Sequence, residues 1–264
     1  MTRGRNYQTE AIVLKYRPIG ESDRLITFFS STLGRITGIA RGVRRPGRRL
    51  GGSLEPLNIV QVSLARGRLF ETVSETSVIK DFNGIKSDLN KVALALYVAE
   101  LTDSFADDWS SNQKLYDLVW RTLADFNKNE YPLYLIHFFE LKLLKFVGYD
   151  PEFWECVECR EKLLPDKYPF APDMGGVLCS KCQLNFDYFP MHISLGAMKI
   201  LRYLQRQKDN ESISSGVTLP QIDLKEVSEI LRNYLRFVAE RQLKSTAFLD
   251  LVTEMPFGDT SKFT

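Results

Sequence analysis

The sequence predicts an α+β protein of more than one domain, in which a small β barrel is followed by a bundle of α-helices. Three observations support this fold class. Short β-branched runs fill positions 8–75, apolar residues then recur at helical spacing from about residue 88, and four cysteines in two pairs interrupt the helical part. We expect a nucleic-acid-binding domain at residues 1–82 and a helical domain at residues 83–264, with the cysteine module at about 150–190.

The N-terminal part alternates short apolar runs with turn residues. Gly34, the 42–52 segment and Arg66-Gly67 separate the runs. Five strands in about seventy residues fit an OB-fold, and an SH3-like barrel fits the same count. The predicted strands are Ala11–Tyr16, Leu25–Phe29, Arg35–Ala40, Leu57–Leu64 and Leu69–Val73.

Helical periodicity begins near Asp88. Ser110 or Ser111 is expected to cap the second helix. Pro132 suits the first turn of the third, and Gly148 is expected to end it. That third helix is apolar on most sides, which predicts a central place in the bundle. The expected helices cover residues 89–105, 115–126, 132–146, 195–205 and 224–242.

Composition is that of a globular chain. Apolar residues make up 44% of the 264, enough to fill a sizeable core. No apolar stretch approaches the roughly 20 residues that a membrane-spanning helix needs. Residues 1–6 are basic, but no apolar segment with a small-residue cleavage site follows them, so we expect no secretion signal. The expected location is the reducing cytoplasm, where disulfides are disfavoured.

Two Cys-x2-Cys pairs, Cys156 with Cys159 and Cys179 with Cys182, are separated by 19 residues. This spacing is typical of a four-thiolate zinc site. Gly175-Gly176 supplies a flexible turn before the second pair. We expect one structural Zn²⁺, because four protein ligands leave no position for a reactive water. Buried free thiols are one alternative, and a redox pair is another, although its usual βαβ context is absent.

Positive charge is concentrated at the N-terminus. The whole chain carries a net charge of +2, yet residues 1–52 hold eleven Arg or Lys against three acids. Arginine makes bidentate contacts with phosphate, so the arginine-rich segment predicts nucleic-acid binding with steep salt dependence and little sequence preference. A solvated charge run that binds nothing is the alternative. The six arginines of this segment are Arg35, Arg41, Arg44, Arg45, Arg48 and Arg49.

Motifs of catalysis and of nucleotide binding are absent from the sequence. Gly never directly precedes Lys, which excludes a P-loop, and neither Gly-x-Gly-x-x-Gly nor His-Glu-x-x-His occurs. His137 lies in a strongly apolar helix and is expected to be packed, whereas His192 is expected to be exposed. We therefore expect a binding protein and not an enzyme, with neither a nucleotide nor a membrane as a partner.

Short motifs along nearly the whole chain occur in one order. They are Ala11-Ile-Val-Leu-Lys15, Gly20-Glu-Ser-Asp-Arg-Leu25, Gly34-Arg-Ile, Ile39-Ala-Arg-Gly42, Leu54-Glu-Pro-Leu57, Phe146-Val-Gly-Tyr-Asp-Pro151 and the two cysteine pairs with Gly175-Gly-Val-Leu-Cys179. Their combination resembles the bacterial DNA repair and recombination mediator family RecO. Two features depart from it: Arg160 stands where zinc-binding members often have glycine, and the segment from Arg45 to Leu50 is more basic than expected.

The resemblance implies an OB-fold barrel and a structural zinc module. It implies a recombination mediator that binds single- and double-stranded DNA and anneals strands coated with single-strand-binding protein. It also implies that the protein joins RecR to load RecA, and that the helical part holds the C-terminal tail of single-strand-binding protein. Arg35 and Arg41 match basic positions implicated in DNA contact, and the location implied is cytoplasmic and nucleoid-associated.

Two other functions fit the residues. A zinc-ribbon RNA-binding or ribosome-associated factor would also use a basic OB barrel. An enzyme without a recognisable motif, such as a nuclease, is the third reading.

Overall fold

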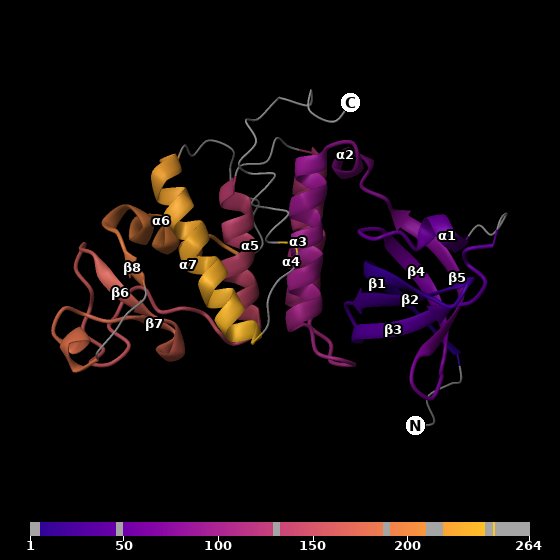
Figure 1. The fold of residues 1–264 in the computed structure, drawn as a ribbon, viewed down its shortest axis with the longest axis horizontal. Coiled ribbons are helices and arrows are strands. Elements are labelled where there is room, and N and C mark those ends of the chain that lie inside the picture. Colours follow the sequence, from indigo (N-terminus) through magenta and orange to yellow (C-terminus); the bar gives the residue numbers. More distant parts are fainter. Residues whose placement is uncertain are drawn as a thin grey trace. The chain divides into compact units, whose positions relative to one another are not determined.

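The computed structural model describes residues 6–45, 50–128, 133–186, 191–209, 219–240 and 245. The chain divides into two units, Met1–Glu130 with Leu243–Thr264, and Tyr131–Gln242. Strands dominate the start of the first unit and helices the rest of the chain (Figure 1), so the predicted α+β class is confirmed. The predicted division at residue 82 stays a prediction.

Five strands close a barrel in the order β1-β2-β3-β5-β4. All neighbours are antiparallel except β3 and β5, which run parallel with Gly38 opposite Glu71. The barrel is an OB-fold, as predicted. Its strands are β1 (Asn6–Ile19), β2 (Asp23–Ser30), β3 (Gly34–Ala40), β4 (Ile59–Ala65) and β5 (Glu71–Lys80).

Strand β1 is longer than predicted at both ends. It pairs with β4 over Asn6–Ile12 and with β2 over Ala11–Ile19, and a register shift between Val13 and Lys15 lets one strand serve both partners. The added ends are mostly exposed, so backbone pairing holds them in place. An apolar alternation could not reveal them for that reason.

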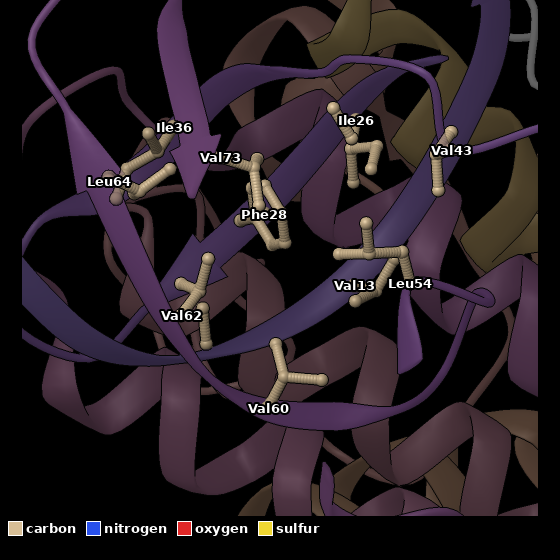
Figure 2. Packing of buried hydrophobic residues seen from close by; sticks show 12 residues of the cluster. Val13, Ile26, Phe28, Ile36, Val43, Leu54, Val60, Val62, Leu64 and Val73 are labelled. Atoms are coloured by element: carbon tan, nitrogen blue, oxygen red, sulfur yellow. The ribbon is translucent and has the colours of Figure 1, made fainter. Parts of the chain in front are cut away.

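The barrel interior is filled by alternate residues of each strand (Figure 2). Phe28 lies in this core, so its ring is not available to stack on a ligand. Gly38 faces the same core, and a Cβ there would lie 3.2 Å from Val73. The core residues include Val13, Ile26, Phe28, Ile36, Val43, Leu54, Val60, Val62, Leu64 and Val73.

Two helices, α3 (Leu89–Phe105) and α4 (Gln113–Lys128), pack outside the barrel. Phe29, on the outer side of β2, is fully buried and lies 6.0 Å from the Tyr116 ring of α4. The Tyr116 hydroxyl donates a hydrogen bond to Glu10 of β1 at 2.7 Å. The outer face of β1 and β2 is therefore covered by helices.

The N-cap prediction for the second long helix is wrong. Asn112, and neither Ser110 nor Ser111, caps α4, because its side-chain oxygen accepts from the Leu115 amide at 3.0 Å. The structure also contains two unpredicted helices, α1 (Leu50–Ser53) and α2 (Asn83–Lys86). Each has four residues, too few for a periodic pattern.

In its described residues, the second unit contains three α-helices, two short 3-10 helices and a small sheet. The α-helices are α5 (Leu133–Phe146), α6 (Leu195–Arg206) and α7 (Gln221–Ala239). Gly148 adopts a positive φ just beyond α5, as predicted, and the Ser194 hydroxyl caps α6. The sheet has the order β7-β6-β8, from β6 (Tyr168–Ala171), β7 (Gly176–Val177) and β8 (Met191–Ile193).

Helix α5 carries buried polar side chains, and their partners are close. His137 Nδ1 lies 2.8 Å from Glu140, and its Nε2 lies 3.0 Å from the Ser228 hydroxyl. Lys142 pairs with Asp209 at 2.8 Å. The helix is central and His137 is packed, as predicted, while His192 is exposed.

Glu71 is a buried acid at the end of the barrel. Neither its Oε2 nor the nearby Tyr7 hydroxyl has a hydrogen-bond partner among the described residues. Burial raises the pKa of Glu71 above its ordinary value, and the nearby charge of Arg66 only partly opposes this. Folded protein therefore holds this proton more tightly than unfolded protein, and stability falls as pH rises from about 4.5 through the folded-state pKa.

Glu71→Gln, a neutral substitution of similar shape, is expected to remove the fall in stability that ionisation of Glu71 causes at high pH. At pH 8 the variant should be more stable than the natural protein by about 1 kcal/mol, whereas at pH 4 the difference should nearly vanish. Urea unfolding at the two pH values measures it. Glu75→Gln, at an exposed acid of the same strand, is the control, and equal effects of the two substitutions would contradict the assignment.

Candidate metal centre and nucleic-acid interface

The four cysteines lie together in the second unit. Their sulfur atoms are all within 4.8 Å of one another, and none forms a disulfide. Cys159 Sγ and Cys179 Sγ are 3.8 Å apart. Tetrahedral zinc with Zn–S bonds of about 2.3 Å requires sulfur separations of about 3.8 Å. The four thiols therefore fit one metal ion of this kind.

Local backbone geometry directs the sulfurs inward. The first pair lies in a turn closed by the Arg160 amide, which donates to the Cys156 carbonyl at 2.9 Å. The second pair follows the β6–β7 hairpin, where Gly175 has a φ of 69°, as the Gly-Gly turn predicted. The two turns are joined because the Val157 amide donates to the Val177 carbonyl at 3.0 Å.

Amide groups also stabilise the thiolate form of Cys156. Burial raises its pKa, but hydrogen bonds from the backbone of Cys159, Cys179 and Glu158 outweigh this and lower the pKa to about 7. The Cys179 amide lies 3.3 Å from Cys156 Sγ. Thiolates are the metal-binding form of cysteine. The hydrogen bond with Cys179 instead raises the pKa of Cys182 to about 12, so the protein by itself favours the thiolate at Cys156 and not at all four positions.

Arg160 adopts a left-handed backbone conformation, with a φ of 62°. A residue with a Cβ pays roughly 1 kcal/mol for that conformation, whereas glycine does not. Arg160→Gly is therefore expected to stabilise the metal-loaded module by up to about 1 kcal/mol without changing its metal content. Thermal unfolding measures the effect. Arg160→Ala keeps the Cβ and should give no gain; if it stabilises equally, backbone strain is not the cause.

Three of the predicted arginines are exposed on the segment that follows β3. Arg41, Arg44 and Arg45 make no ion pair with any other residue that the structure describes. Their guanidinium groups are available to phosphate. Arg48 and Arg49 lie outside the described residues.

The β1–β2 turn anchors this segment. Asp23 accepts a hydrogen bond from the Gly42 amide at 2.8 Å, and the Arg44 amide donates to the Ser22 carbonyl at 3.0 Å. The Gly42 bond is the main reason that the pKa of Asp23 lies below its usual range. Asp23 thus fixes the backbone from which the three arginines project.

Arg35 is engaged differently. Its Nε lies 2.6 Å from Asp108, and its Nη1 donates to the Asp103 carbonyl at 2.6 Å. The side chain of Asp103 is buried, and its carboxylate lies 2.5 Å from Lys15 Nζ. Hydrogen bonding to Asp108 accordingly raises the pKa of Arg35. The predicted DNA contact of Arg35 stays a prediction, and its visible role is to tie β3 to the end of α3.

Two further arginines, Arg66 and Arg68, lie outside the arginine-rich segment that the sequence singles out. They flank Gly67 in the β4–β5 loop, and both are exposed. The Arg-Gly-Arg pattern served only to predict a turn. Its charge, next to the apolar pair Leu69 and Phe70, was the signal that could have revealed a surface.

Known families match both parts of the chain. The family described as "Recombination protein O N terminal" matches residues 1–82, and "Recombination protein O C terminal" matches residues 86–247. The chain belongs to the RecO family. Membership of the RecO family supports a role in DNA repair and recombination. None of the described helices is long and apolar enough to cross a membrane.

Relatives named "DNA repair protein RecO" agree with the family match. The protein of Dehalococcoides mccartyi is 34% identical over 250 residues, covering 95% of this chain and 97% of the relative. That of Roseiflexus sp. is 35% identical, covering 96% and 88%. That of Pelotomaculum thermopropionicum is 32% identical, covering 96% of each. The likeness to the RecO family thus extends over nearly the full length.

Proposed function

We propose that this protein is a non-enzymatic DNA-binding mediator of recombination and repair. The observation that carries the proposal is the group of exposed arginines, Arg41, Arg44 and Arg45, fixed by Asp23 at one end of an OB barrel. Such a group binds phosphates without reading bases, so it accepts both single- and double-stranded DNA. Residues 1–82 would form the DNA-binding domain.

The same arginine charges would also promote the annealing of complementary DNA strands. Two complementary strands repel each other, and a basic loop that neutralises phosphates on both lowers this repulsion. We further propose that the protein works with RecR to load RecA on DNA coated with single-strand-binding protein. The helical part would hold the acidic C-terminal tail of that protein. These roles place it in the cytoplasm, associated with the nucleoid.

We propose Zn²⁺ as the ion of the four-cysteine site. Cys156, Cys159, Cys179 and Cys182 would hold it, and four thiolate ligands fill its coordination. Its role would be to stabilise the fold of the module and not to catalyse a reaction.

Annealing of complementary labelled strands, with and without single-strand-binding protein, tests the proposed function. We expect the protein to accelerate annealing in both cases. Failure to bind or anneal DNA at low salt would refute it. Competition of labelled single-stranded DNA by RNA of equal length tests the RNA-binding alternative, because an RNA-binding protein would release the DNA readily. Cleavage of DNA in the presence of Mg²⁺ would indicate an enzyme.

A further inference from the structure

The β4–β5 loop, residues 66–70, presents positive charge on a tight turn. Arg66 and Arg68 are exposed and make no ion pair within the described ranges. Gly67 makes the turn tight, since a Cβ there would overlap the carbonyl oxygen of Phe70. Leu69, beside Arg68, exposes 88% of its surface, so an apolar side chain adjoins the charge. The loop has the composition of a binding surface.

Two aromatic rings lie at the same end of the barrel. Trp109 is 45% exposed, and its ring makes a T-shaped contact with the Tyr7 ring at a centroid distance of 6.3 Å. Its amide donates to the Arg35 carbonyl at 3.3 Å, which fixes it beside the start of β3. Phe70 is 36% exposed. Exposed rings on a fixed backbone provide stacking platforms for unpaired bases.

The parallel β3–β5 ladder connects this end to the Arg41–Arg45 segment. Gly38 pairs with Glu71, so residues 66–70 come before this register and the Arg41–Arg45 segment comes after it. Phe70 and Arg41 are thus four residues apart along the ladder, or about 13 Å at 3.3 Å per residue. The outward residues between them, Thr37, Ile39 and Thr72, are uncharged and partly exposed.

Strand β3 lies between β2 and β5 in the barrel, and the outer face of β2 is covered by helices. An OB-fold commonly binds nucleic acid over its second and third strands. Here the outer side of β2 is buried beneath the helices, as the Phe29–Tyr116 contact shows. A ligand that contacts β3 therefore has open surface toward β5 and not toward β2.

We propose that a single strand of nucleic acid crosses the outer face of β3 and β5. The Arg41–Arg45 segment would hold phosphates at one end, and Arg66 and Arg68 would hold them at the other, with bases stacked on Trp109 and Phe70. The proposal rests on the proposed DNA-binding function and adds a second contact to it. Because paired bases do not expose their faces, the aromatic end favours single strands over duplexes.

Acids near this end offset only part of its charge. The charge of Arg66 partly opposes the rise in the pKa of Glu71, so these two groups interact. Asp108 is neutralised by Arg35 at 2.6 Å. Glu71 is buried and alternates with the outward Thr72, so it faces the barrel interior. Asp107 is the remaining exposed acid of the Trp109 loop, against two arginines.

Titration of labelled oligothymidylate with the full-length protein over a range of salt concentrations tests the phosphate contacts. Arg66→Ser/Arg68→Ser should lower affinity by about tenfold and reduce the slope of log affinity against log salt by about 1.4. Lys114→Ser/Lys128→Ser removes two exposed charges from α4 and should change neither. If the arginine variant keeps the natural affinity and slope, the second contact is wrong. If the natural protein itself fails to bind, the proposed function fails first.

Tryptophan fluorescence tests the stacking. The chain has three tryptophans, so Trp120→Phe/Trp154→Phe leaves Trp109 as the single reporter. Oligothymidylate should quench this reporter at saturation. In the natural background, Trp109→Ala should weaken oligothymidylate binding by roughly 5- to 100-fold, and duplex binding much less. The proposed binding path would be wrong if Trp109 fluorescence were not quenched in a saturated complex. It would also be wrong if Trp109→Ala lowered the affinities for oligothymidylate and for duplex DNA equally.

Discussion

Loss of the metal ion is expected to unfold the cysteine module while the OB barrel stays folded. The module has little regular structure, because β6, β7 and β8 contain four, two and three residues. Structural zinc supplies on the order of 10 kcal/mol to small domains that cannot fold without it. Cys156→Ser removes a fully buried member of the proposed ligand set and should abolish stoichiometric binding. Elemental analysis should find about one zinc per natural chain and almost none in the variant.

Limited proteolysis distinguishes unfolding of the module from global unfolding. We expect rapid cleavage within the module of Cys156→Ser and a persistent N-terminal fragment. Ser180→Ala, at an exposed position between the second pair of cysteines, is the matched control and should retain both metal and resistance. Natural protein that lacks metal but shows four titratable thiols would disprove the metal site. The arginine segment belongs to the other unit, so DNA affinity of the variant should change little.

Features with a local cause could be predicted from the sequence. The five strands follow from apolar alternation, and the gathering of the four cysteines follows from their spacing, because two residues between the members of a pair define a turn. Helix α5 could be predicted because apolar residues of its own sequence lie on most of its sides. In each case the signal lies within a few residues of the feature that it predicts.

Features that depend on distant residues could not be predicted. Arg35 reads as a member of a basic run, yet its partners Asp103 and Asp108 follow some seventy residues later. The covering of β2 by α4 likewise requires Tyr116 to meet Phe29. Because that contact closes one face of the barrel, the sequence alone could not identify the face that remains open.

Replacing Arg41, Arg44 and Arg45 together with alanine is expected to cause the largest loss of DNA affinity. If each contacts one phosphate, the salt slope should fall by about 2 on single strands and by nearly 3 on duplexes, with affinity reduced roughly 100-fold at moderate salt. Stability should change by less than about 0.5 kcal/mol, because all three side chains are exposed. Fluorescence anisotropy over a salt series measures the slope, and urea unfolding measures the stability.

The same two assays, applied to Arg35→Ala, show whether the charge of Arg35 stabilises the fold or contacts DNA. Its removal takes one cationic partner away from buried Asp103, so we expect a loss of about 1 kcal/mol in stability and little change in salt slope. A lowered slope would instead assign Arg35 to the DNA contacts that its family match predicts. Lys114→Ala/Lys128→Ala/Lys167→Ala removes three exposed charges elsewhere and should leave the slope intact. An equal loss in this control would mean that net charge, and not the segment after β3, governs binding.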